Sequence, residues 1–109
     1  MLALALLLAV APPAPSLVLW AWERPEDLRF IDTREVGVAY LAGTVGVRGD
    51  AVEARPRMQP LRVPADASMT AVVRIEAKAP ALSATQAREV ARVVARLADA
   101  ERARCVQVD

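Results

Sequence analysis

Residues 83–109 read SATQAREVARVVARLADAERARCVQVD, and this stretch decides the predicted fold. Ser83 stands three residues before Gln86, the spacing at which two side chains each satisfy the other's free backbone N–H at a helix start. Apolar residues then recur at intervals of three and four, as on one face of an α-helix: Ala87, Val90, Ala91, Val94, Leu97 and Ala98. The pattern therefore predicts an amphipathic helix that begins at Ser83.

A short apolar segment, residues 105–108, follows this helix and has the composition of a strand. A helix that leads into a strand is the second part of the crossover that joins two parallel strands. Such a crossover also needs an earlier strand in the same sheet. We therefore expect a parallel sheet to which the sequence before Ser83 contributes.

Three earlier apolar runs have the length and composition of buried strands: residues 17–22, 36–42 and 69–76. Between the first two, Pro25 is followed by Glu26 and Asp27, residue types that favour the first turn of a helix. We expect a short helix there. Together with residues 105–108, the three runs predict four parallel core strands.

The segment between the second and third predicted strands has no helical pattern. Residues 44–47 and 51–55 are short strand-like runs on either side of Arg48-Gly49-Asp50, and a glycine in that place is typical of a tight turn. Residues 55–64 then contain three prolines, which exclude a helix interior. A β-hairpin with an extended return segment is therefore expected in place of a crossover helix.

These elements predict an α/β fold, the N-terminal half of a (β/α)8 TIM-type barrel with a β-hairpin insertion between the second and third core strands. A complete barrel of this kind takes about 250 residues, whereas the chain has 109. Residues 17–109 are therefore interpreted as a partial barrel-like domain.

Residues 1–16 contain an unbroken apolar run followed by a proline-rich segment. The run is shorter than the roughly 20 residues that span a bilayer, and it fits the apolar core of a signal peptide. We expect an exported, periplasmic or extracellular protein with no stable membrane span. The alternative is an N-terminal apolar segment that is retained as an anchor.

Composition excludes several classes of function. The net charge is +1, from 14 basic and 13 acidic residues, which gives no electrostatic basis for binding nucleic acid. The chain has no histidine and one cysteine, so neither a zinc site nor a histidine base is expected, and no cofactor is indicated. Any acid–base chemistry would have to use carboxylates.

Three carboxylates follow predicted strands: Glu23, Glu76 and Asp109. In a parallel barrel, residues at the C-terminal ends of strands meet at one rim, where glycoside hydrolysis requires a pair of carboxylates. These three residues are the candidate catalytic groups. The alternative is that each caps a helix or pairs with an arginine, as Glu23 could with Arg24 or Arg74.

Two further residues are candidates for substrate binding. Trp20 and Trp22 share one strand face by the two-residue period, and Trp22 could stack on a sugar or pack in the core. Gln107 shares the face of Asp109 and could line the barrel interior. Cys105 is interpreted as a small buried hydrophobic residue.

The blocks WAWERPEDL, residues 20–28, and RPRMQPL, residues 55–61, resemble those of a secreted bacterial family known only as a domain of unknown function. The resemblance covers residues 17–109. It implies a barrel similar to glycoside hydrolases, of which this chain looks like the N-terminal half.

On this basis the chain is interpreted as a fragment of an exported, carbohydrate-active barrel, with carbohydrate as the expected partner. Two alternatives stay open. One is a non-catalytic cell-envelope interaction domain that uses residues 43–64 as its contact surface, and the other is a truncated product without activity. The sequence does not indicate whether the protein is an enzyme, and it does not indicate the oligomeric state.

Overall fold

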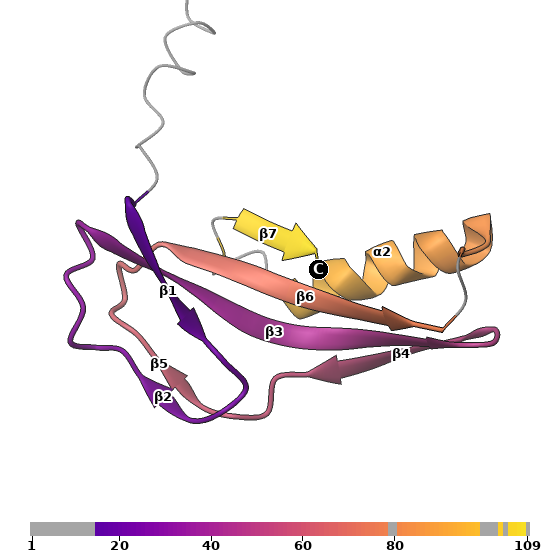
Figure 1. Cartoon of the computed structure of the whole chain (residues 1–109), viewed down its shortest axis with the longest axis horizontal. Helices are drawn as coiled ribbons and strands as arrows, with labels where there is room; N and C mark the ends of the chain where they lie inside the picture. Colours follow the sequence, from indigo (N-terminus) through magenta and orange to yellow (C-terminus); the bar gives the residue numbers. More distant parts are fainter. Residues whose placement is uncertain (1–14, 79–80, 99–102, 104, 109) are drawn as a thin grey trace, which may run out of the picture.

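The computed structural model describes residues 15–78, 81–98, 103 and 105–108. Its main sheet is built around the long strand β3 (Val36–Arg48). This strand pairs in parallel with β1 (Leu17–Ala21) on one edge and with β6 (Met69–Ala77) on the other, and β7 (Cys105–Val108) pairs in parallel with β6. The order β1-β3-β6-β7 confirms the four predicted parallel strands (Figure 1).

The predicted hairpin is also confirmed. Strand β4 (Ala51–Pro56) pairs antiparallel with the second part of β3, and Gly49 turns the chain between them with a φ of 54°. A left-handed backbone of this kind is accessible to glycine without a steric penalty. Strands β1 and β4 therefore share one edge of β3, and the register between β3 and β6 shifts between Leu41 and Gly43, where β3 changes neighbours.

Helix α2 (Ala84–Ala98) begins as the sequence predicts. The backbone N–H of Ser83 donates to Oε1 of Gln86 at 2.9 Å, and the backbone N–H of Gln86 donates to Oγ of Ser83 at 3.1 Å. The side chain of Gln86 also donates to the carbonyl of Gly49. The capping residue thus joins the start of α2 to the hairpin turn.

The buried face of α2 is rotated from the predicted one. Val90 and Val93 are buried, whereas Ala87 and Ala91, which belong to the predicted apolar stripe, are exposed. Val93 lies outside that stripe but removes more apolar surface from water than an alanine does. The helix therefore turns its valines toward the sheet.

Helix α2 covers one face of the sheet toward the C-terminal ends of β3 and β6 (Figure 1). The core beneath it combines residues of both strands with residues of the helix: Val45, Val47, Ala71, Val73, Val90 and Val93. Because neighbouring residues in a strand point to opposite faces, the residues that alternate with these lie on the other face. We call that other face the tryptophan face, since Trp20 and Trp22 lie on it.

The prediction of a short helix after Pro25 is wrong. Glu26 and Asp27 form strand β2 (Glu26–Asp27), which pairs in parallel with β5 (Leu61–Arg62). The backbone N–H of Glu26 donates to the carbonyl of Pro60 at 3.1 Å, and that of Leu28 to Arg62 at 2.7 Å. Leu28 also packs in a second core cluster with Ala21, Val38 and Met69. These long-range contacts outweigh the local preference for a helix start.

Asp27 provides a test of this segment by pH. The pKa of Asp27 is lowered from 3.8 to about 2, chiefly by side-chain hydrogen bonds from Arg29, whose Nη2 lies 2.6 Å from Oδ2. The ion pair therefore contributes stability above the unfolded pKa of 3.8 and loses it as the pH falls through about 2. In an NMR titration, Arg29→Gln should move the Asp27 midpoint back toward 3.8. Arg34→Gln should leave it unchanged, and an equal response to both variants would contradict the assignment.

The half-barrel prediction is wrong. The described chain is mostly β-structure, and α2 is the single helix that joins two of its parallel strands. The connection from β1 to β3 carries strand β2, and the connection from β3 to β6 carries β4 and β5. These two connections therefore lack the helix of a β/α unit. Their backbone N–H and C=O groups form hydrogen bonds with other strands, whereas in a helix they would bond within the same segment.

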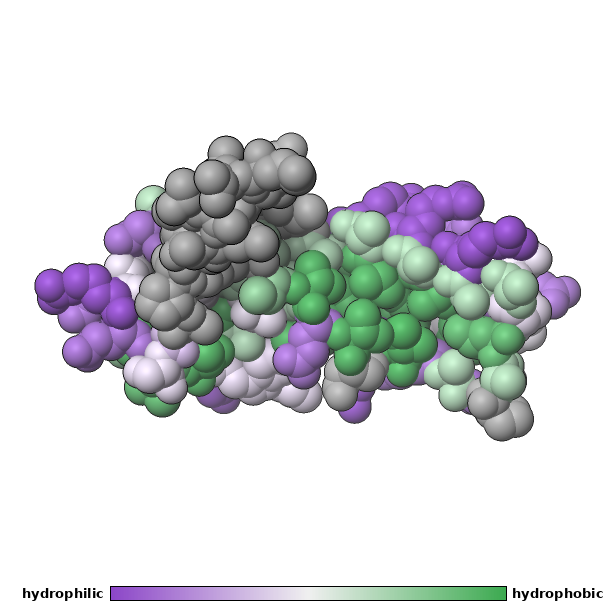
Figure 2. Space-filling model, turned by 90° about the horizontal axis from the view of Figure 1, so that it is seen from above, coloured by the Kyte–Doolittle hydropathy of each residue, from purple (hydrophilic) through white to green (hydrophobic). Residues whose placement is uncertain are grey.

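The free edge of β7 carries apolar side chains. Val106 and Val108 are about half exposed, and beyond β7 the described residues add no further strand. Figure 2 looks down on the molecule from the side on which β7 lies, and hydrophobic surface gathers in the middle of this view.

The predicted signal sequence covers residues 1–16, and all of it except residues 15 and 16 lies outside the described residues. Among the helices that are described, none has the length and apolar character needed to cross a membrane.

Candidate functional site

Two exposed tryptophans form the most distinctive surface feature of the described chain. Trp20 is 44% exposed and Trp22 is 49% exposed, so core packing does not account for either ring. Their ring centroids lie 5.5 Å apart with the planes tilted by 59°, which confirms that both point to the same face. Large aromatic surface left open to water in a fixed arrangement is typical of a binding site.

The part of the sheet next to the tryptophans carries apolar side chains that are shielded from solvent. Ala21 pairs with Tyr40, so Trp22, the next residue, is level with Leu41 of β3 and with Val72 of β6 on the tryptophan face. Leu41 and Val72 are each only 5% exposed. Trp22 therefore lies at the edge of the sheet, next to an apolar part of its surface.

Gln107 lies on the same face but at the opposite edge. It pairs with Val72, which places it level with Trp22 across the sheet. Three strand spacings separate the two residues, or about 14 Å. The structure therefore puts both predicted binding residues on one face without bringing them into contact.

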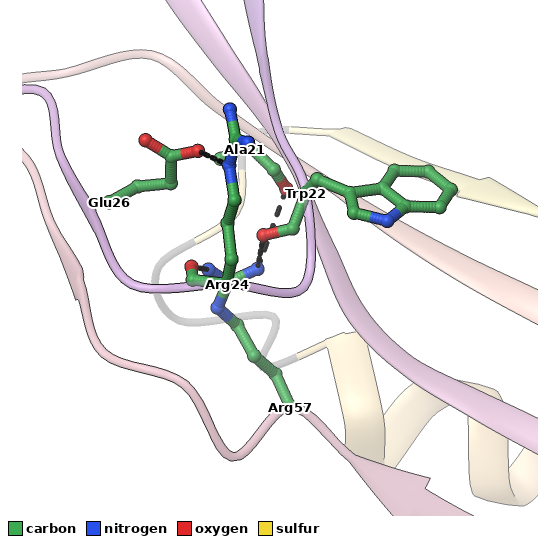
Figure 3. Close-up of polar contacts among 5 residues, drawn as sticks. All are labelled: Ala21, Trp22, Arg24, Glu26 and Arg57. Atoms are coloured by element: carbon green, nitrogen blue, oxygen red, sulfur yellow. Dashed lines mark hydrogen bonds and ion pairs between the residues drawn. The ribbon is translucent and has the colours of Figure 1, made fainter.

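Arg57 holds the backbone on which Trp22 is carried. Its Nη1 donates to the carbonyl of Trp22 at 2.7 Å and to that of Ala21 at 3.4 Å, and its Nη2 donates to the carbonyl of Arg24 at 2.7 Å. Its Nε donates to the carbonyl of Gln59 at 2.9 Å. Figure 3 shows the guanidinium group against this turn, with the indole of Trp22 pointing away from it. Arg57 therefore fixes the turn and leaves the ring free.

The turn is supported on its other side by a pair of charges. Nε of Arg24 donates to Oε1 of Glu26 at 2.6 Å, a contact also visible in Figure 3. This hydrogen bond, together with the negative charge of Glu26, raises the pKa of Arg24 above its ordinary value. Residues 20–28 and 55–61 thus contact each other through Arg57 and through the pairing of β2 with β5.

The predicted catalytic carboxylates are not brought together. Glu23 lies in the turn after β1 ends at Ala21, which is level with Ala71 of β6. Glu76 stands five residues beyond Ala71, or about 16 Å further along the strand direction. Asp109 lies outside the described residues.

Glu76 has a charged partner from a distant part of the chain. Nη2 of Arg55 on β4 lies 2.6 Å from Oε2 of Glu76, and both side chains are about half exposed. The sequence indicated in general terms that a strand-end carboxylate could pair with an arginine, and for Glu76 that arginine is Arg55. The ion pair therefore joins β4 to β6 across β3.

Cys105 is exposed, so the prediction of a small buried residue is wrong for it. On the described residues, no group of three His, Cys, Asp or Glu side chains is placed to hold a metal ion.

Sequence reasoning missed Arg57, which holds the turn that carries Trp22, and Glu53, which stands beside Gly46 on the tryptophan face. For Glu53, the alternation of residues 51–55 could have placed it on the same side as Arg55, opposite Val52. Nothing in the sequence could have shown that Arg57 reaches carbonyls more than 30 positions away. Its contacts depend on the tertiary fold.

Comparisons with known proteins add no assignment. No family model matches this chain, and no curated protein or solved structure is significantly similar to it.

Proposed function

We propose that this protein binds carbohydrate on its tryptophan face, with Trp22 as the residue on which a sugar ring stacks. One face of a sugar ring exposes mainly C–H groups, which pack on the electron-rich face of an indole. The observation that carries the proposal is the pair of half-exposed indoles with centroids 5.5 Å apart. Arg57 supports it, because a ring on a fixed backbone loses little conformational entropy on binding.

The tilt of the two rings limits how a ligand can bind. With 59° between the planes, a single sugar ring can stack on only one indole at a time. Trp22 is the better stacking residue because its own carbonyl and that of Ala21 accept hydrogen bonds from Arg57. Trp20 then forms a side wall for the bound sugar.

Nucleic acid is a weaker candidate for the same surface. Bases also stack on aromatic rings, but such proteins combine stacking with a positively charged groove that follows the phosphates. Here 14 basic residues are balanced by 13 acidic ones, so the chain as a whole does not attract a polyanion.

Binding is proposed, and not hydrolysis, because the predicted carboxylates Glu23 and Glu76 do not meet at one rim of the sheet. Glycoside hydrolysis needs two carboxyl groups about 5–9.5 Å apart with different protonation states. Glu76 stands about 16 Å beyond the level at which β1 ends, two residues before Glu23, and it is held by Arg55.

Affinity electrophoresis of the full chain tests the proposal. We expect at least one polysaccharide in a panel of hydroxyethylcellulose, xylan, mannan, starch and laminarin to retard the protein. Trp22→Ala should weaken this retardation at least about fivefold, because loss of one stacking contact costs about 1–3 kcal/mol. Phe30→Ala is the matched control, since Phe30 is an exposed aromatic residue, 79% exposed, outside the site. Absence of retardation by every polysaccharide, or equal retardation of both variants, would contradict the proposal.

A further inference from the structure

A groove lies on the tryptophan face, between β4 and β6. It is an open groove of about 400 Å³ whose floor is Gly46 of β3. Glu53 of β4 and Glu76 of β6 are the register partners of Gly46 on its two sides. The walls of the groove are therefore formed by charged residues on either side of a residue without a side chain.

The groove lies on the same face as the tryptophans. Val52 of β4 and Ile75 of β6 pack against the core under α2, so their neighbours Glu53 and Glu76 point the other way. Trp22 stands level with Val72, and Glu76 follows four residues later on β6. The groove thus begins about 13 Å from Trp22 along the strand direction.

Gly46 keeps the groove open. A Cβ atom at this position would lie 3.9 Å from Nη2 of Arg55 and 3.9 Å from Oε2 of Glu53, so there is room for a side chain that the protein leaves empty. Arg55 crosses above Gly46 to reach Glu76 at 2.6 Å. The missing side chain lets this ion pair span β3 while both partners stay partly exposed.

The groove presents both hydrogen-bond donors and acceptors. Besides the Arg55–Glu76 pair, Arg48, Lys78 and Glu53 line it, and none of these three forms an ion pair with another described residue. Arginine and lysine only donate, and ionised glutamate only accepts. A sugar hydroxyl can do both, so such a mixture suits a neutral, hydroxyl-rich ligand better than a strongly anionic one.

We propose that this groove is a second sugar subsite, so that the ligand is a neutral oligosaccharide that runs along β3 from Trp22 to Gly46. This inference rests on the proposed function, because it extends the same ligand beyond the tryptophans. At the apolar end of this surface, Trp22 stacks on one sugar ring. At the charged end, the residues of the groove form hydrogen bonds with the hydroxyl groups of sugar units further along the oligosaccharide. Affinity therefore rises with the length of the sugar chain.

Tryptophan fluorescence titrations of the full chain test this inference. The probes are the disaccharide and the hexasaccharide of the polysaccharide that retards the chain most; for hydroxyethylcellulose they are cellobiose and cellohexaose. We expect the hexasaccharide to bind at least tenfold more tightly than the disaccharide. Glu53→Gln and Gly46→Val should remove most of that difference without changing the affinity for the disaccharide, whereas Trp22→Ala should weaken both.

The outcomes separate the two proposals. Equal affinity for both oligosaccharides, or groove variants that keep the full length dependence, would overturn the second subsite and leave the tryptophan site standing. No binding of either oligosaccharide would overturn the proposed function and this inference with it. Glu53→Gln keeps the test valid if Gly46→Val fails to fold, because Glu53 is exposed and the change keeps its shape. Tighter binding of carboxymethylated than of neutral chains would overturn the choice of a neutral ligand.

Discussion

Arg57→Ala is expected to lower the free energy of unfolding by about 2–4 kcal/mol. The guanidinium group donates to four backbone carbonyls, those of Ala21, Trp22, Arg24 and Gln59. A hydrogen bond from a charged group contributes about 1.5–3 kcal/mol, and the sum is reduced because these carbonyls can partly turn to water. Urea unfolding followed by circular dichroism measures the loss.

Two other variants show whether the geometry of Arg57 matters. Arg57→Lys keeps the charge but loses the planar fork, so it should recover less than half of the lost stability. Arg34→Ala removes an arginine whose side chain is 88% exposed and whose bonds reach only Asp32, two residues away. Its effect should stay within about 0.5 kcal/mol. If Arg57→Ala were no more destabilising than Arg34→Ala, Arg57 would not hold the turn.

Arg57→Ala should also weaken sugar binding at temperatures where the variant stays folded. Release of the turn lets the backbone of Trp22 move, so ordering it again costs part of the binding energy. A variant that lost stability but kept full affinity would show that Trp22 is placed by packing against Trp20 and not by Arg57.

The sequence predicts the main sheet well because its signals are local. Each parallel strand is an apolar run, the hairpin turn contains a glycine, and the helix start carries its own reciprocal cap between Ser83 and Gln86. Proline content correctly excludes a helix between β4 and β6. These features depend on residues close together in the chain.

Features that depend on distant contacts could not be predicted in the same way. Pro25, Glu26 and Asp27 have the composition of a helix start, but pairing with Leu61 and Arg62 makes them a strand. The half-barrel prediction assumed a helix in the connection from β1 to β3, and the pairing of β2 with β5 replaces that helix.

The same division holds for the candidate site. The shared face of Trp20 and Trp22 follows from the period of a strand and is confirmed. The meeting of carboxylates at one rim assumed strands that end at one level, but β6 runs past the end of β1. The charged groove depends on Glu53 and Glu76 lying on either side of Gly46, which only the register shows.

Gly43→Val is expected to destabilise the protein by about 3 kcal/mol. Gly43 lies at the end of the pairing between β3 and β4, and Leu97 of α2 packs above it. A Cβ atom there would lie 2.8 Å from the carbonyl oxygen of Arg55 and 3.0 Å from both methyl groups of Leu97. The leucine can shift, but the carbonyl belongs to the β4 backbone, so the strand itself must move. Overpacking of this kind costs about 1–3 kcal/mol, and the two methyl groups of valine place it at the upper end.

Gly46→Ala is the matched control, because it lies three residues further along the same strand. The nearest atoms to its added Cβ would be 3.9 Å away, which is an ordinary van der Waals contact. Alanine also loses less backbone entropy on folding than glycine, so this variant should gain up to about 1 kcal/mol. Urea unfolding of the two variants beside the parent chain compares them directly. Similar losses of stability for Gly43→Val and Gly46→Ala would contradict the close approach of α2 and β4 at Gly43. A loss for Gly43→Val together with a gain for Gly46→Ala would show that this close approach is confined to Gly43 and that the groove over Gly46 is open.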